Sequence, residues 1–291
     1  MIMADQDQDG SHIKGLIINL IHFYWKSLLK LGFIEEFITP ILKAKKGKIE
    51  LSFFSQPEYE EWKNKHADWN TYDTKHYKGL GGHETWEAEQ YFAKIQRHRI
   101  QFVFESEDDT HAINMAFNKE FKDQRKDWIA NHMEEKKKIK EENGPVDYLY
   151  KEGVQEVSYS EFIYKELILF LVYDVEHSIP SVVDGFKPGQ RKVMFTCLKR
   201  NDQKQVKVAQ LAGAVGEQSA YHHGEASLTG TMVKLAQNYV GSNNINLLQP
   251  NGQFGTRLAG GKDSSAPRYI HTQMSPLARV CTLGQAYFQS P

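Results

Sequence analysis

IMADQDQDGS, residues 2–11, is the stretch that decides how the first part of this chain folds. Ile2–Ala4 has the apolar character of the end of a buried strand. Ser11 is a good N-cap for a helix whose apolar residues recur through Leu16 and Leu20. A strand that runs directly into a helix is typical of an α/β domain, and we predict one here.

The same stretch carries three aspartates at alternate positions, Asp5, Asp7 and Asp9. In extended backbone alternate side chains point to the same side, so we expect the three carboxylates to lie together. Carboxylates this close repel one another unless a cation neutralises them. Hard oxygen ligands suit Mg²⁺, with Mn²⁺ or Ca²⁺ as substitutes, rather than zinc. The sequence therefore predicts a divalent metal site.

Two other interpretations of the aspartates compete with this one. An EF-hand loop begins with the same pattern, but Leu16 occupies the position that needs a bidentate glutamate. The four residues before Asp5 are also too few for an entering helix. The second alternative is an acidic helix N-terminus that is stabilised by the helix dipole, which leaves no role for a metal.

The rest of residues 1–116 continues the α/β pattern. The glycine-rich segment Lys78–Gly82 predicts a turn, and Thr85–Gln96 predicts a helix. Strands are expected at Phe33–Leu42, Lys48–Phe54 and Ile100–Phe104.

Residues 117–159 are expected to form a charged helix and a linker. The helical propensity ends in the mixed charge run Glu134–Glu142, which is followed by Asn143-Gly144-Pro145. A solvated helix before a linker is the plain interpretation of such a run.

Residues 160–291 predict several short helices joined by glycine-bearing turns. We expect them at Ser160–Val172, from Pro188 to Leu198, at Val206–Val215 and at Ala226–Tyr239. This pattern favours a helix-turn-helix or winged-helix module. The predicted fold class is therefore α/β followed by α+β.

Bulk composition limits the function only loosely. The chain has 291 residues and a formal net charge of -1, so any nucleic-acid contact must come from local basic clusters. Cys197 and Cys281 are too few for a disulfide framework, and we expect a reducing, intracellular setting. Three lysines interrupt the apolar run Ile13–Phe33, so no membrane span is expected. No signal peptide precedes the acidic stretch, and the chain is expected to begin inside a domain.

A series of further motifs follows the acidic stretch. They are Tyr77–Gly81, Ile179–Ser181, Val183–Lys192, Lys207–Gly213, Gly241–Asn244, Gln253–Arg257, Gly260–Asp263 and Pro267–Ile270. In order and spacing the whole series closely resembles eukaryotic-type (type IIA) DNA topoisomerase II, to about Arg279. Residues 5–16 resemble the TOPRIM metal-binding motif of that family. The resemblance implies a partial, Rossmann-like TOPRIM domain at 1–116 and a winged-helix DNA-cleavage domain at 160–291 that is truncated at the tower region.

The resemblance also implies the site residues. Tyr269 matches the catalytic tyrosine, which forms a 5′-phosphotyrosyl bond with DNA. Arg268 and Arg191 match arginines at the scissile phosphate, and His223 matches a histidine close to it. Asp5 and Asp7 match the aspartates that coordinate Mg²⁺, with Asp9 in a supporting role. Without the resemblance, one tyrosine among 14 would not stand out, and His222-His223 would be taken for a surface pair.

A set of basic residues is expected to contact the DNA backbone, although surface solubility explains any single one of them equally well. The set comprises Lys187, Lys192, Lys199, Arg200, Lys204, Lys207 and Lys262.

The resemblance carries wider expectations. It implies double-stranded DNA as partner, a homodimer, a nuclear location, and ATP hydrolysis in an ATPase domain that is not in this sequence. A metal-binding glutamate of the family lies upstream and is absent here, so we expect an incomplete fragment of an ATP-dependent topoisomerase. The alternatives are a non-catalytic DNA-binding fragment and a dominant-negative partner of a full-length topoisomerase chain.

Overall fold

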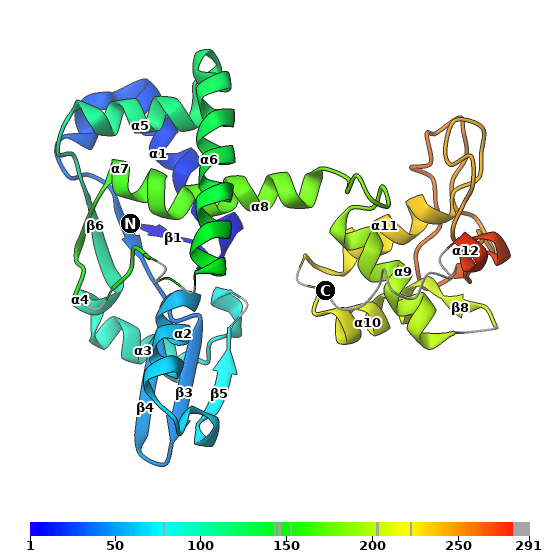
Figure 1. The fold of residues 1–291 in the computed structure, drawn as a ribbon, viewed down its shortest axis with the longest axis horizontal. Coiled ribbons are helices and arrows are strands. Elements are labelled where there is room, and N and C mark those ends of the chain that lie inside the picture. Colours follow the sequence, from blue (N-terminus) through cyan, green and yellow to red (C-terminus); the bar gives the residue numbers. More distant parts are fainter. Residues whose placement is uncertain are drawn as a thin grey trace. The chain divides into compact units, whose positions relative to one another are not determined.

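The computed structural model describes residues 1–77, 79–142, 144, 147–151, 153–201, 204–221 and 223–281. The chain divides into two compact units, Met1–Glu176 and His177–Pro291 (Figure 1). Each unit has a hydrophobic core of its own, so each is described separately. No helix among these residues is both long enough and apolar enough to cross a membrane.

A four-stranded mixed sheet forms the centre of the first unit. Its strands are β1 (Ile2–Met3), β2 (Glu35–Phe37), β6 (Arg99–Val103) and β7 (Glu156–Ser158), in the order β1-β2-β6-β7. The outer pairs are parallel and the central pair is antiparallel. The mixed α/β class that the sequence predicts is therefore present.

Helices complete this unit. They are α1 (Gln8–Leu29), α5 (Glu107–Phe117), α6 (Lys122–Glu141), α7 (Tyr159–Glu161), the π-helical turn η4 (Phe162–Leu167) and α8 (Ile168–Ser178), with the short 3₁₀ turn η3 (Lys119–Phe121) before α6. Their side chains bury Ile18, Ile113 and Phe162 against Ile100 and Phe102 of β6. The core therefore lies between the sheet and these helices.

The helix after the acidic stretch begins earlier than the sequence predicts. Asp7, and not Ser11, is the N-cap of α1, because its side chain accepts a hydrogen bond from the Gly10 amide at 2.8 Å. The expectation that Asp5, Asp7 and Asp9 share one extended segment is therefore wrong. Asp9 lies in the first helical turn, where side chains follow a 3.6-residue period instead of alternating.

A smaller antiparallel sheet extends the first unit. It consists of β3 (Leu42–Lys46) between β4 (Ile49–Phe53) and β5 (Asp73–His76). The neighbouring helical segments are α2 (Gln56–Lys65), η1 (Trp69–Thr71), η2 (Leu80–Gly82), α3 (Thr85–Ala93) and α4 (Ile95–His98). Leu42, Ala44, Phe53 and Tyr59 form a separate small core here.

The contacts divide the chain after Glu176, whereas the sequence places the linker at 117–159. The charged helix is present as α6, and no residue of it is fully buried. The segment that follows nevertheless belongs to the first unit, because Tyr150 and Tyr159 are buried in its core. Aromatic side chains after the charge run therefore hold this segment in the first unit.

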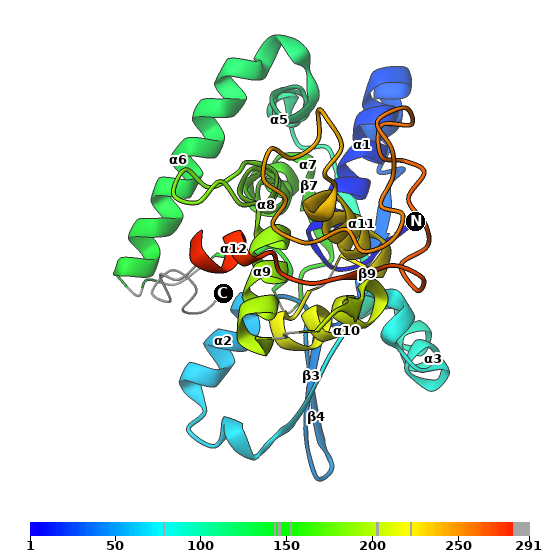
Figure 2. The same cartoon turned by 90° about the vertical axis from the view of Figure 1, so that its right-hand side faces the viewer.

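The second unit is built around three helices, α9 (Pro188–Arg200), α10 (Val208–Ser219) and α11 (Glu225–Ala236). All three contact one another, and Figure 2 shows them grouped together. A two-stranded ladder, β8 (Val206–Lys207) with β9 (His271–Thr272), and the short α12 (Pro276–Cys281) complete it. The helices predicted from Pro188, Val206 and Ala226 are confirmed to within about two residues at their starts.

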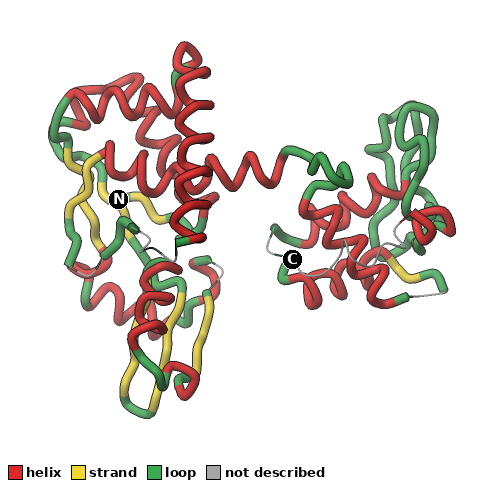
Figure 3. Tube along the Cα trace, in the orientation of Figure 1, coloured by secondary structure: helices red, strands yellow, loops and turns green. Residues whose placement is uncertain are grey.

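A long segment of loops and turns connects α11 to β9 (Figure 3). Within it only isolated bridges occur, Leu248 with Met274 and Asn251 with His271. Phe254 and Ile270 fix the segment to the core of the second unit. Four of the motifs from the sequence lie in it, including the one that contains Tyr269.

Candidate functional site

Tyr269 lies in a tight turn that is held from both sides. Its own amide donates to the Ala266 carbonyl at 2.9 Å. The start of α10 supports the turn, because the Ala209 amide donates to the Pro267 carbonyl at 3.2 Å. The next residue, Ile270, is only 2% exposed and anchors the turn in the core. Tyr269 itself is 67% exposed, so a rigid turn presents its hydroxyl to solvent.

Arg268 covers one face of this tyrosine. Its guanidinium carbon lies 4.9 Å from the centre of the Tyr269 ring, within the range of a cation–π contact. The contact places a permanent positive charge beside the phenol. A phosphodiester that approached the hydroxyl would therefore meet a cation at the same point.

The glycine-rich loop before Tyr269 closes on itself. Gln237 donates through Nε2 to the carbonyls of Phe254, at 2.9 Å, and Gly261, at 3.1 Å. A Cβ on Gly261 would lie 2.4 Å from that nitrogen, and its φ of +78° also favours glycine. Asp263 accepts from the amide and the hydroxyl of Thr256, each at 2.8 Å. These bonds shape the loop that leads to the tyrosine.

Arg191 lies on the first turns of α9 in the same unit. It forms a bidentate ion pair with Asp184, with Nε at 3.0 Å and Nη2 at 2.7 Å from the carboxylate oxygens. The pKa of Asp184 is lowered, chiefly by this hydrogen bond with Arg191. Sequence reasoning named the arginine but missed its acidic partner, although both lie in one motif.

His223 lies two residues after Tyr221, just before α11. Its ring lies 5.5 Å from the ring of Tyr221 and 4.6 Å from that of His177, measured between centroids. Histidine and aromatic rings thus gather where α11 begins. His222, the other histidine of the pair, lies outside the described residues.

The basic residues that were predicted to contact DNA fall into two groups. Lys192 is half-buried and its Nζ lies 3.5 Å from the carbonyl of Ala220, the residue that ends α10. Burial lowers the pKa of Lys192. Lys192 therefore has a structural partner at a helix C-terminus. The remaining members are exposed: Lys187, Lys199, Arg200, Lys204, Lys207 and Lys262.

The three aspartates belong to the first unit and have different surroundings. Asp5 accepts from the Leu80 amide at 2.6 Å, and a Cβ on Gly79 would lie 2.7 Å from its carboxylate. Asp7 caps α1, while Asp9 is exposed in the first helical turn. The loop motif at Gly79 thus packs against the acidic motif, as only a glycine at this position permits.

Among the described residues, no set of three His, Cys, Asp or Glu side chains is arranged to hold a metal ion. Carboxylate oxygens are nevertheless the donors that Mg²⁺ prefers, and this ion is commonly bound by one or two carboxylates together with water and substrate phosphates. Asp5 and Asp7 therefore fit Mg²⁺ by donor type, provided that other ligands complete the shell. The alternative of an acidic helix N-terminus also describes Asp7 and Asp9 correctly.

A buried polar cluster lies beneath the acidic stretch and was missed by sequence reasoning. Lys14 and Glu36 are both fully buried, with Nζ 2.9 Å from Oε2. Lys14 also donates to Gln6, between the aspartates, at 3.4 Å. Ser11 donates to Glu166 at 2.7 Å, and burial raises the pKa of that carboxyl. These contacts hold the acidic stretch and the start of α1 against the buried side chains of the first unit.

A second network of buried charges adjoins the glycine-rich turn that contacts Asp5. Glu87 accepts from Lys43 Nζ at 2.8 Å and from the hydroxyl of Tyr77, the residue that precedes the Lys78–Gly82 segment in the sequence. His83 stacks on Tyr77 with ring centroids 4.0 Å apart. The turn that contacts Asp5 is therefore tied to a charged network in the smaller sheet.

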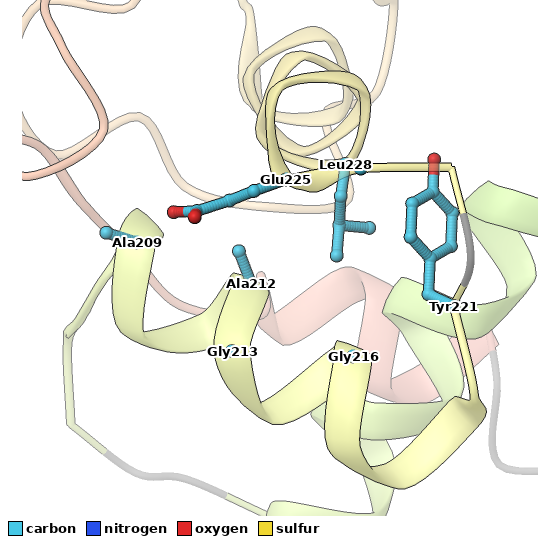
Figure 4. Close-up of a pocket in the computed structure, with 8 residues that line it drawn as sticks. Ala209, Ala212, Gly213, Gly216, Tyr221, Glu225 and Leu228 are labelled. Atoms are coloured by element: carbon cyan, nitrogen blue, oxygen red, sulfur yellow. The ribbon is translucent and has the colours of Figure 1, made fainter. Parts of the chain in front are cut away.

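A cavity of 340 Å³ lies between α10 and the start of α11 (Figure 4). One wall is formed by small residues at helical spacing, Ala209, Ala212, Gly213 and Gly216. Glu225, Leu228 and Tyr221 face them. The spacing of the small residues is visible in the sequence, but the cavity is not, because α11 supplies the opposite wall.

Comparison with known proteins matches both units. Residues 37–175 match the family described as the C-terminal associated domain of TOPRIM. Residues 177–285 match the family of the DNA gyrase/topoisomerase IV A-subunits. The chain is 61% identical over 280 residues to DNA topoisomerase 2 of Bombyx mori and 59% identical to DNA topoisomerase 2-alpha of Rattus norvegicus. Each alignment covers 96% of this chain and 18% of the relative.

The chain belongs to the type II DNA topoisomerase family.

A solved structure supports the same assignment. The crystal structure of the Plasmodium falciparum topoisomerase II DNA-binding, cleavage and re-ligation domain matches with a TM-score of 0.76 and 49% identity. The match covers 96% of this chain and 36% of that one. The chain thus spans less than a fifth of the length of its type II topoisomerase relatives from silk moth and rat.

The two family matches meet where the fold divides. One ends at residue 175 and the other begins at residue 177, on either side of the division at Glu176. The type II topoisomerase sequence and the packing of this chain therefore agree on where one unit ends.

Proposed function

We propose that this chain is part of the DNA cleavage and religation region of an ATP-dependent type II DNA topoisomerase, an isomerase, with Tyr269 as the nucleophile. One observation carries the proposal. Tyr269 is exposed on a turn anchored at both ends, with the Arg268 guanidinium on its ring. A structural tyrosine would gain by burying its ring, whereas a nucleophile must reach a substrate from a fixed position.

The reaction is a phosphoryl transfer from the DNA 3′-oxygen to the tyrosine oxygen of the protein. The Tyr269 oxygen attacks the phosphorus, a new O–P bond forms, and the bond to the 3′-oxygen breaks. The phenol gives up its proton and the departing 3′-oxygen gains one. The product is a 5′-phosphotyrosyl ester, and reversal of the same step religates the strand. Because the bond energy is kept in the ester, religation requires no further energy source.

The protein's part in this step is mainly electrostatic. A phenol has an ordinary pKa of about 10, so little of it is ionised at neutral pH. Arg268 and Arg191 would hold the non-bridging oxygens, where negative charge develops during transfer. His223 would contribute a further hydrogen bond close to the same phosphate. Their combined role is to orient the phosphate and to lower the cost of its charge.

Mg²⁺ is the proposed metal, with Mn²⁺ or Ca²⁺ as substitutes. Asp5 and Asp7 would hold it, supported by Asp9, and the ion would neutralise charge on the DNA phosphates. The oxygen donors of these residues, and the position of Asp5 beside the Gly79 turn, support this assignment. Asp5 would remain oriented by the Leu80 amide while it binds the ion.

Finer features are proposed in the same way. Residues 1–116, within the first unit, would be the partial TOPRIM domain. Residues 160–291, with α9–α11 and the β8–β9 ladder, would be the winged-helix module. Double-stranded DNA would be the partner and its backbone would meet the exposed basic residues. The homodimer and the nuclear location are proposed for the whole protein, whose ATP would bind in a region that this sequence does not contain.

A covalent-adduct assay tests the proposal. The chain and its Tyr269→Phe variant are incubated with a nicked duplex and Mg²⁺ or Mn²⁺, and the products are separated on a denaturing gel. We expect a protein–DNA band that is absent for Tyr269→Phe. Tyr24→Phe is the matched control, since Tyr24 is also exposed and lies in the other unit.

Two outcomes contradict the proposal. Salt-sensitive duplex binding with no covalent band indicates the non-catalytic DNA-binding fragment. Co-purification with a full-length topoisomerase chain, without an adduct through Tyr269, indicates the dominant-negative partner.

A further inference from the structure

Asp184 is an acidic side chain placed beside the arginine that is proposed to meet the scissile phosphate. Its carboxylate oxygens accept from Nε of Arg191 at 3.0 Å and from Nη2 at 2.7 and 2.9 Å. The two side chains are only 22% and 33% exposed. An acidic group in a site for an anion requires an explanation, because it repels the phosphate that the arginine attracts.

The carboxylate of Asp184 is itself fixed by a short loop. The Phe186 amide donates to its Oδ1 at 3.0 Å. The loop is closed by two backbone hydrogen bonds, from Ser181 to Phe186 at 3.0 Å and from Gly185 to Ser181 at 2.8 Å. Gly185 has a φ of +73°, which favours glycine. Asp184 therefore offers a rigid acceptor to a long, flexible arginine.

The ion pair with Asp184 occupies one edge of the Arg191 guanidinium and leaves the Nη1 side open to a ligand. Nε and Nη2 face Asp184, and Nη2 also lies 3.4 Å from the Phe186 carbonyl. Within the described residues, Nη1 of Arg191 makes no hydrogen bond. Its two N–H groups are thus held in a defined direction by contacts on the opposite edge.

We propose that Asp184 is a positioning residue, which holds Arg191 so that Nη1 is directed at a DNA phosphate. The inference rests on the proposed function of Arg191 as a phosphate contact. A planar guanidinium binds phosphate well only in a defined orientation, and a carboxylate on its far edge supplies that orientation before DNA arrives. An aspartate carboxyl is ionised at neutral pH, and the hydrogen bond from Arg191 lowers the pKa of Asp184 further.

Whether Asp184→Asn raises or lowers the affinity for DNA distinguishes a positioning role from simple repulsion. Asp184→Asn removes a negative charge from a DNA-binding surface, which by itself strengthens binding to a polyanion. It also keeps an acceptor for the Phe186 amide, so the loop retains its hydrogen bond. If Asp184 positions Arg191, the variant binds duplex DNA more weakly, by about three- to tenfold. Glu217→Gln is the control, as an exposed residue of the same unit from which the same charge is removed.

The experiment is a double-mutant cycle on the full chain, with a short duplex, low salt and EDTA. We expect Arg191→Ala to weaken binding by about tenfold. When Arg191 is already alanine, Asp184→Asn should not weaken binding further. The control Glu217→Gln should not weaken binding, whether Arg191 is present or replaced. Tighter binding by Asp184→Asn, additive losses in the cycle, or no effect of Arg191→Ala would each overturn the inference.

The cycle is independent of cleavage, because EDTA removes the metal. Coupling between Asp184 and Arg191 without any Tyr269 adduct would disprove the proposed function and leave the positioning role in place. An adduct without this coupling would disprove only the positioning role.

Discussion

Asp7 shows how one residue serves a fold and a candidate site together. Its Oδ1 accepts from the Gly10 amide at 2.8 Å, which satisfies one of the free amides at the start of α1. The same carboxylate is one of the proposed Mg²⁺ ligands. A loss of metal binding on substitution is therefore ambiguous unless the cap is kept.

Two substitutions at Asp7 separate these roles. Asp7→Asn keeps a side-chain oxygen for the cap, so we expect stability within about 0.5 kcal/mol of the original and a clear loss of Mg²⁺ affinity. Asp7→Ala should lose the same affinity and also about 1 kcal/mol of stability. Urea unfolding and Mg²⁺ titration calorimetry measure the two quantities. Equal stability of both variants would show that the cap contributes nothing.

In the small sheet, two buried charged side chains connect the strand β3 to the helix α3. Glu87 is only 1% exposed. Its Oε1 forms an ion pair with Nζ of Lys43, on β3, at a distance of 2.8 Å. Burial raises the pKa of Glu87, but hydrogen bonds from Lys43 and Tyr77 outweigh it and lower the pKa to about 2. These side chains join a strand to a helix through charge instead of apolar packing.

The lowered pKa predicts an acid-sensitive element. Because the folded pKa is near 2 and the unfolded value is near 4.5, the stabilisation from ionised Glu87 is complete above about pH 5. It is lost as the pH falls towards 2. Glu87→Gln should cost about 3 kcal/mol at pH 7 and reduce the loss of stability between pH 5 and 2.

Urea unfolding at several pH values measures this effect. Glu61→Gln is the control, because Glu61 pairs with Lys65 on the surface and both side chains are at least half exposed. We expect little change from it, as solvent screens such a pair. An unchanged pH profile in Glu87→Gln would refute the role given to the network.

At the scale of the whole molecule, the chain is two units with two cores. The five tryptophans are Trp25, Trp62, Trp69, Trp86 and Trp128, all within the first unit. Tryptophan fluorescence therefore reports on the first unit, while far-UV circular dichroism reports on the helices of both. The two signals allow each core to be followed in one sample.

A core substitution in the second unit should affect only one of these signals. Met232 is fully buried there, and Met232→Ala should destabilise that unit by about 2–5 kcal/mol. We expect an earlier transition in circular dichroism and an unchanged transition in fluorescence. Ile113→Ala, in the core of the first unit, should shift the fluorescence transition. Coincident shifts of both signals with either variant would show that the units unfold together.

The sequence by itself determined the family, the α/β class, the starts of α9, α10 and α11, and the Tyr269 motif. These features depend on local signals such as Pro188 in the first helical turn and apolar periodicity over one helix. The cap of α1 was predicted at the wrong residue, although the contact that forms it is local, from the Gly10 amide to Asp7. Ser11 matches the sequence rule, but its hydroxyl is bonded to Glu166, 155 positions away.

Only the tertiary structure decided several other features that sequence reasoning missed. The pairing of Lys14 with Glu36 and of Lys43 with Glu87 joins residues on separate elements. The two walls of the cavity and the end of the first unit at Glu176 also depend on which elements pack together. Local propensity acts over a few residues, whereas these features arise from contacts between segments that are distant in the chain.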